Sequence, residues 1–141
     1  MPKPTHTVLA FDFGLSQIGV AVGNSLLQTT EPLPVLRANN GKPDWAALET
    51  LINEWCPDLL VVGDPINMDD SVGELAIRSR KFARRLEGRF GKPIAMTDER
   101  LTSFEAKLSQ RERGHKGNYK KNPVDSIAAE LILQTWIRQQ S

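Results

Sequence analysis

The sequence predicts one α/β domain, built on a mixed five-stranded sheet whose first three strands are antiparallel, with helices on both faces. Its 141 residues suit a single hydrophobic core. The composition, 40% hydrophobic and 25% charged, is typical of folded soluble proteins. The first three apolar runs have the length of strands and are separated by short links, which predicts a meander. The later strand-length runs alternate with helical patterns. With no internal repeat and no linker, residues 1–141 are expected to form one domain.

The first three strands are expected over residues 8–13, 18–23 and 29–36. The first is an apolar run typical of a strand buried on both faces. The second carries glycines and alanine, which leave room for close packing on one face. Pro32 and Pro34 interrupt the third, which therefore suits an edge position.

The remaining elements alternate in type. Helices are expected over residues 45–56, 72–90 and 123–138, and strands over residues 59–63 and 93–97. Asp44 is placed to cap the first helix and Pro57 to end it. Residues 109–122, rich in glycine and basic side chains, are expected to form a loop.

Charge is unevenly distributed along the chain. Residues 78–121 hold fourteen Lys and Arg against five Asp and Glu, a net charge of +9, although the whole chain carries +1. This concentration of positive charge in one segment is typical of a protein that presents a basic face to a polyanion. The alternative is that long surface helices are simply rich in Arg and Lys.

Acidic side chains follow the predicted strands where each strand ends. Asp12, Asp64 and Glu99 lie at the carboxyl ends of their strands, and parallel strands bring those ends to one rim. Asp125 falls about 100° around the last helix from Val124, inside its apolar arc. A helix-capping role would also explain Asp125, but an outward-facing acid would cap equally well.

Carboxylates that converge repel one another unless a cation neutralises them. With one cysteine and two histidines the chain has no zinc-ligand spacing, so oxygen ligands imply Mg²⁺ or Mn²⁺. Such a site suits phosphodiester hydrolysis, in two-metal form with one ion activating water and the other stabilising the leaving oxygen. Beside a basic segment, it is the combination that a nuclease needs.

Five motifs, in order along nearly the whole chain, resemble the bacterial YqgF/RuvX family. They are Asp12-Phe13-Gly14, Ile18 to Gly23, Val61-Val62-Gly63-Asp64-Pro65, Asp98 to Ser103, and Val124 to Ala129. The resemblance implies an RNase H-like fold similar to that of Holliday-junction resolvases. It also implies a nuclease that matures the 5′ end of the 16S ribosomal RNA precursor, with a resolvase as the alternative. By the same resemblance Asp12, Glu99 and Asp125 are the catalytic, metal-binding acids.

The chain departs from the family pattern at several positions. Gln17 stands where many members carry a basic residue, and Asp64 precedes Pro65 where leucine is usual. In related resolvases an acid at the end of the neighbouring strand is a metal ligand, so Asp64 is either a ligand or a loop residue facing water. Asp70 replaces a usual glycine, which is expected to stiffen its turn.

In this hypothesis Asp12 bridges the metals, and Glu99 and Asp125 each hold one side. Arg100 either pairs with the scissile phosphate or orients Glu99. Nucleic-acid backbone contacts are expected from basic residues of the charged segment, namely Arg84, Arg85, Arg100, Arg111, Arg113, Lys116, Lys120 and Lys121.

Two other classes of protein remain as alternatives. An ATP-binding domain of the actin and sugar-kinase type has a similar first hairpin, but 141 residues leave no room for its second lobe. The other alternative is a non-catalytic RNA-binding factor of ribosome biogenesis, in which the acids would have only a structural role.

The expected partners are precursor 16S RNA, branched DNA or ribosomal particles. A cytoplasmic location and no membrane are expected, from the single cysteine and from the lack of an apolar signal or spanning segment. Junction cutting would require a dimer, whereas a monomer would favour RNA processing.

Overall fold

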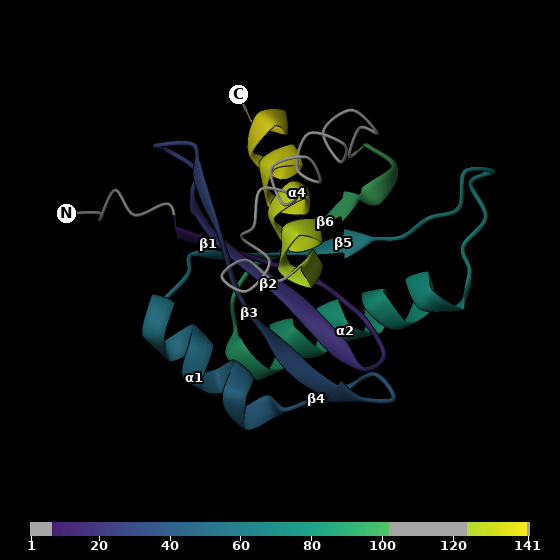
Figure 1. Ribbon diagram of the computed structural model, residues 1–141, viewed down its shortest axis with the longest axis horizontal. Helices are drawn as coiled ribbons and strands as arrows, with labels where there is room; N and C mark the ends of the chain where they lie inside the picture. Colours follow the sequence, from purple (N-terminus) through teal and green to yellow (C-terminus); the bar gives the residue numbers. More distant parts are fainter. Residues whose placement is uncertain (1–6, 102–123, 141) are drawn as a thin grey trace.

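A computed structural model describes residues 7–101 and 124–140 of the chain. Its centre is one sheet with the strand order β4-β3-β2-β1-β5-β6 (Figure 1). The strands are β1 (Thr7–Asp12), β2 (Gln17–Asn24), β3 (Thr29–Asn39), β4 (Lys42–Pro43), β5 (Leu59–Asp64) and β6 (Ile94–Asp98). The first four pair antiparallel, whereas β5 and β6 run parallel to β1. The predicted mixed sheet with an antiparallel first half is therefore confirmed.

The helices also follow the predicted order. They are α1 (Trp45–Trp55), α2 (Glu74–Phe90) and α4 (Val124–Gln139), and a short 3₁₀ turn, η1 (Glu99–Leu101), follows β6. At the start of α1 the Asp44 carboxylate accepts a hydrogen bond of 3.2 Å from the backbone amide of Ala47. Cys56 ends the helix in the left-handed conformation, directly before Pro57. The predicted cap and stop are both confirmed.

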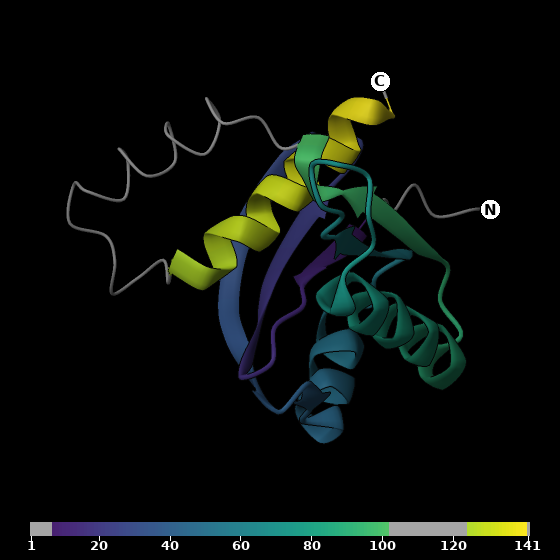
Figure 2. The same cartoon turned by 90° about the vertical axis from the view of Figure 1, so that its right-hand side faces the viewer.

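Helices cover both faces of the sheet. Figure 2 shows α4 on one side and α1 and α2 on the other. Successive strand residues point to opposite faces, so β1 contributes to two separate cores. Leu9, Phe11 and Phe13 pack with α1 and α2, whereas Val8 and Ala10 pack under α4.

The sheet has six strands, one more than predicted. The additional strand, β4, is only two residues long and pairs with Ala38 and Asn39 at the end of β3. Its sequence, within Asn39 to Pro43, is rich in turn-forming residues. A two-residue strand has no periodicity to detect, so the sequence pattern missed it.

The third strand extends to Asn39 despite its two prolines. Its pairing with β2 shifts between Ile18 and Val20, which face Leu36 and Leu33. Two β3 residues, Pro34 among them, therefore stand opposite the single Gly19, and this bulge accommodates a residue that cannot donate to the ladder. None of the helices in the described part of the chain is both long enough and apolar enough to cross a membrane.

Candidate active site

The three parallel strands have their carboxyl ends along one rim of the sheet, and the last residue of each is an acid. Asp12 closes β1, Asp64 closes β5 and Asp98 closes β6, directly before Glu99 in η1. The register pairs Phe11 with Val62, and Asp64 with Asp98. The acids predicted at the strand ends therefore share one rim, and Asp98 is a further member of it.

The alternation of side chains along the strands divides this rim between two faces. Phe11 and Phe13 pack on the side of α1 and α2, so the half-buried Asp12 between them faces α4. On β5, Val62 packs toward α2 and Val61 toward α4. Gly63 therefore faces α4, as Asp12 does, and Asp64 faces α2.

The Glu99 carboxylate lies over Gly63. A Cβ atom built at Gly63 would stand 2.8 Å from Glu99 Oε2 and 2.6 Å from Ile132 Cδ1 of α4. Only a residue without a side chain leaves room for both groups. Asp12 and Glu99 thus lie on the α4 face of two adjacent strands, β1 and β5. No role was predicted for Gly63, although its place between a buried strand and an acid is a usable signal in the sequence.

The first turn of α4 lies level with the end of β1. The hydroxyl of Ser126, which is fully buried, donates a hydrogen bond to the backbone carbonyl of Leu33. Leu33 pairs with Val20, which pairs with Phe11. The backbone of Asp125 therefore begins a helix on the face that carries Asp12 and Glu99, while its side chain lies outside the described residues.

Two described carboxylates, those of Asp12 and Glu99, lie on this face of the rim. Within the described residues no group of three or more His, Cys, Asp or Glu is arranged to hold a metal ion. The described acids on the α4 face, Asp12 and Glu99, supply carboxylate oxygens, the ligands that Mg²⁺ and Mn²⁺ prefer. The donor set fits such an ion, and the third predicted ligand, Asp125, would have to complete it.

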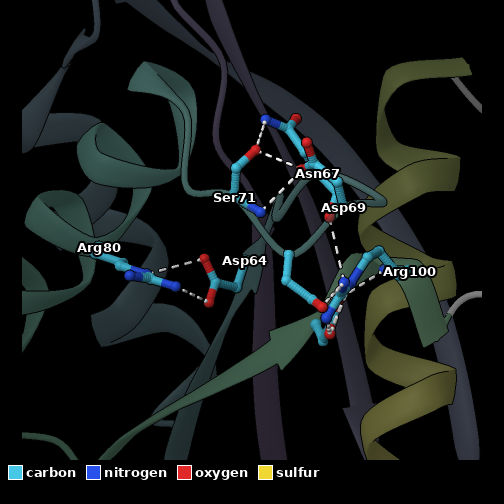
Figure 3. Close-up of polar contacts among 8 residues, drawn as sticks. Asp64, Asn67, Asp69, Ser71, Arg80 and Arg100 are labelled. Atoms are coloured by element: carbon cyan, nitrogen blue, oxygen red, sulfur yellow. Dashed lines mark hydrogen bonds and ion pairs between the residues drawn. The ribbon is translucent and has the colours of Figure 1, made fainter.

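Asp64 lies on the opposite face, where it is bound by an arginine of α2. Arg80 donates two hydrogen bonds to its carboxylate, at 3.1 and 2.9 Å (Figure 3). Asp64 is 8% exposed, so the prediction of a loop residue facing water is wrong. The ion pair raises the pKa of the Arg80 guanidinium and connects β5 to α2. Asp64 therefore lies on the face opposite Asp12 and Glu99, and the described residues hold no group of three metal-binding side chains that includes it.

Arg100 is surrounded by hydrogen-bond acceptors. Its Nη2 lies 2.7 Å from Asp98 Oδ2, and its Nε donates to both oxygens of the same carboxylate at 3.1 Å. Its Nη1 contacts Asp70 Oδ1 at 2.5 Å and the backbone carbonyl of Asn67 at 3.2 Å. Figure 3 shows the guanidinium between the strand end and the loop after β5. These contacts connect the η1 turn, which carries Glu99, to the loop after β5.

The loop after β5 explains why an acid can stand at Asp70. Asp70 has a φ of 71°, in the left-handed region that favours glycine. Asp69 accepts hydrogen bonds from the Ser71 hydroxyl at 2.6 Å and from the Ser71 amide at 3.0 Å, which lower the pKa of Asp69. The turn is therefore held by its neighbours, and the ion pair with Arg100 offsets the strained backbone of Asp70.

The predicted nucleic-acid contacts are spread over several places. Arg84 and Arg85 project from opposite flanks of α2, Arg84 toward Ile94 and Met96 of β6 and Arg85 toward β4 and α1. Both side chains are exposed. The other predicted contacts lie outside the described residues, namely Arg111, Arg113, Lys116, Lys120 and Lys121.

The sheet order and the helices on its two faces define an α/β domain of the RNase H-like class. A structure of Thermus thermophilus RuvC in complex with a Holliday junction substrate matches with a TM-score of 0.62 at 17% identity, covering 95% of this chain and 94% of that one. The fowlpox virus Holliday junction resolvase matches with a TM-score of 0.53 at 10% identity, over 96% and 99% of the two chains. At these identities the fold is what is shared.

Sequence comparison identifies the family. The family model RuvX, described as Holliday junction resolvase, matches residues 6–139. A protein of Saccharophagus degradans is 52% identical over 135 residues, which cover 96% of this chain and 95% of the relative. One of Pseudomonas putida is 53% identical over 131 residues, 92% and 93% of the two chains. Both carry the name "Putative pre-16S rRNA nuclease". The chain belongs to the RuvX family, which confirms the resemblance seen in its motifs.

The ion pair between Asp98 and Arg100 is expected to make the stability of the fold depend on pH in the acidic range. Hydrogen bonds from Arg100 hold the pKa of Asp98 below its usual 3.8, against the opposing effect of burial. A carboxylate with a lowered pKa stabilises the fold above its unfolded value and loses that effect as the pH falls through the folded value. We expect Asp98→Asn to lower the melting temperature by roughly 3 °C at pH 7.

The difference between the Asp98→Asn variant and the unaltered protein should stay constant from pH 7 to pH 5 and shrink below pH 4, as Asp98 itself becomes protonated. Thermal melts followed by circular dichroism at each pH measure it. The control is Glu49→Gln, on the exposed face of α1. Asp58→Asn would not serve, because Asp58 accepts a hydrogen bond from the backbone amide of Thr7. A difference that is independent of pH down to pH 3 would contradict the assignment.

Proposed function

We propose that this protein is a divalent-metal-dependent endonuclease that hydrolyses phosphodiester bonds of RNA, with the 5′ end of the 16S ribosomal RNA precursor as its substrate. The name of its relatives, at about half identity over nearly the whole chain, supports the substrate. One structural observation carries the chemistry: the Glu99 carboxylate lies over Gly63, on the face to which Asp12 points. A cytoplasmic location and contact with ribosomal particles belong to the same proposal.

The proposed active site is formed by Asp12, Glu99 and Asp125. Asp12 is at its centre, because β1 lies between β2 and β5 in the sheet. Glu99 faces it from the β5 side, and Asp125 begins the helix that crosses the same face. When bound, Mg²⁺ or Mn²⁺ would activate a water molecule and neutralise charge on the phosphoryl oxygens, in a two-metal arrangement.

Residues of the chain itself have the task of holding these carboxylates in place. Asp12 is fixed by the pairing of the last residue of β1 with Gly19 of β2. Glu99 is fixed by its place in η1, directly between Asp98 and the arginine that binds it. We infer that Arg100 acts as a positioning residue for Glu99.

Resolution of Holliday junctions is the second candidate. The description of the family model and the likeness of the fold to RuvC favour it. Symmetric junction cutting requires two active sites, so a stable dimer would support this substrate and a monomer would support RNA processing. Family membership favours a nuclease of either kind over an ATP-binding domain, and catalytic turnover distinguishes both from a non-catalytic RNA-binding factor.

Substituting Asp12 with Asn should abolish metal-dependent cleavage while the fold remains. The change removes a charge and keeps the volume, so the melting temperature without metal should change little. The assay incubates the protein and the variant with precursor 16S RNA and with a four-way DNA junction, each with Mg²⁺ or Mn²⁺. Cleavage by Asp12→Asn at the rate of the unaltered protein would refute the mechanism.

Substituting Gly63 with Ala should displace Glu99 and reduce cleavage on the order of 100-fold, because a carboxylate moved by about 1 Å loses its catalytic geometry. The new methyl group would stand 2.8 Å from Glu99 Oε2. The matched control is Gly88→Ala on α2, where a Cβ atom meets nothing within 4 Å. Both variants should fold, with some loss of stability in Gly63→Ala from overpacking. A folded Gly63→Ala variant with full activity would argue against Glu99 as a catalytic group.

A further inference from the structure

A cationic pocket lies on the face of the sheet opposite α4. It encloses about 120 Å³ between α2, the start of α1 and the turn that joins β3 to β4. We call it the hairpin pocket. Its lining includes Phe13, Gly41, Lys42, Arg78, Lys81 and Arg85.

The side chains around the hairpin pocket carry charge of one sign. Arg78, Lys81 and Arg85 recur three and four residues apart on one flank of α2, and Lys42 approaches from β4. No acid is among the lining residues. Across the described part of the chain, no ion pair joins any of these four cations to a carboxylate. Converging positive charges create a strong local potential for an anion.

The pocket wall is held by a specific contact with the β3–β4 turn. Arg78 Nη2 donates a hydrogen bond of 2.9 Å to the backbone carbonyl of Asn40. Gly41 beside it has a φ of 82°, and a Cβ atom there would lie 3.2 Å from Arg78 Nη2 and 3.3 Å from the Phe13 ring. Glycine therefore permits both the turn and the close approach of the guanidinium. The carbonyl partner is neutral, so Arg78 keeps its net charge.

The same turn is attached to the loop that follows Asp12. The amide of Gly41 donates to the carbonyl of Leu15 at 2.8 Å, and the amide of Ala38 donates to the carbonyl of Ser16 at 2.9 Å. Phe13, the residue next to Asp12, lines the pocket itself. The hairpin pocket and Asp12 therefore lie on the two sides of one short stretch of backbone at the rim.

The size of the pocket limits what it can hold. Sites for whole small molecules usually enclose about 300–1,000 Å³, well above the 120 Å³ found here. A compact anionic group fits this volume better than a nucleobase with its sugar. We propose that the hairpin pocket binds a backbone phosphate of the nucleic-acid substrate, near but distinct from the scissile phosphate. This proposal rests on the proposed nuclease function.

The test compares two single-charge variants in the Asp12→Asn background, so that binding is measured without cleavage. Lys81→Gln removes one cation from the pocket, at an exposed helix position. Lys92→Gln removes one cation between α2 and β6, at the opposite end of the parallel strands. Fluorescence anisotropy with a single-stranded 2′-O-methyl RNA of the precursor sequence gives the affinity at several salt concentrations.

For Lys81→Gln we expect affinity to fall about two- to fivefold, and the slope of log K against log[salt] to flatten by about 0.7. Lys92→Gln should match the Asp12→Asn parent in both measurements. A series of oligonucleotides, each with one phosphate replaced by a neutral methylphosphonate, then locates the contact. A single methylphosphonate at a position other than the cleavage position should weaken binding to the Asp12→Asn parent and to Lys92→Gln. The same methylphosphonate should not weaken binding to Lys81→Gln, which has already lost the contact.

Equal methylphosphonate profiles for Lys81→Gln and Lys92→Gln would overturn the pocket assignment. So would binding of a polyglutamate peptide that depends on Lys81 when RNA binding does not, since the occupant would then be an acidic protein. These results are separable from failure of the nuclease proposal. If the 2′-O-methyl RNA binds with the expected Lys81 dependence but the protein with Asp12 intact never cleaves unmodified precursor RNA, the nuclease proposal fails and the phosphate contact stands.

Discussion

The alternation of side chains along parallel strands is the constraint on which this site depends. β1, β5 and β6 deliver their last residues to one edge, and the period of two then sends neighbouring residues to opposite faces. Asp12 and Gly63 face α4, whereas Phe13 and Asp64 face α2. The same geometry places the proposed acids on one side of the sheet and the hairpin pocket on the other.

The charges of the rim are arranged around this division. Arg80 engages Asp64 on the α2 side, and Arg100 engages Asp98 and Asp70 beside the loop after β5. Asp64 and Asp98 of the rim are thus held in ion pairs that connect elements of the fold. The proposed catalytic acids are different residues. The cations of the hairpin pocket pair with no carboxylate among the described residues, and this distinguishes them from Arg80 and Arg100.

Much of the fold could be predicted from the sequence, because its apolar runs and helix caps are local signals. The acid at the carboxyl end of β1, Asp12, and the capping of α1 by Asp44 were predicted for this reason. The two-residue strand β4 carries no such signal. The partner of Asp64 was missed because it depends on which helix covers which face. The position of Glu99 over Gly63 depends in turn on the β5–β6 pairing and on the turn η1, which no local pattern encodes.

The most direct test of the central claim is the position of a bound metal ion. A crystal of the protein soaked in Mn²⁺ would show that position by anomalous scattering. We expect a peak on the α4 face, within about 2.0–2.2 Å of carboxylate oxygens of both Asp12 and Glu99. A peak on the α2 face at Asp64, or Mn²⁺ bound without Asp12, would contradict it.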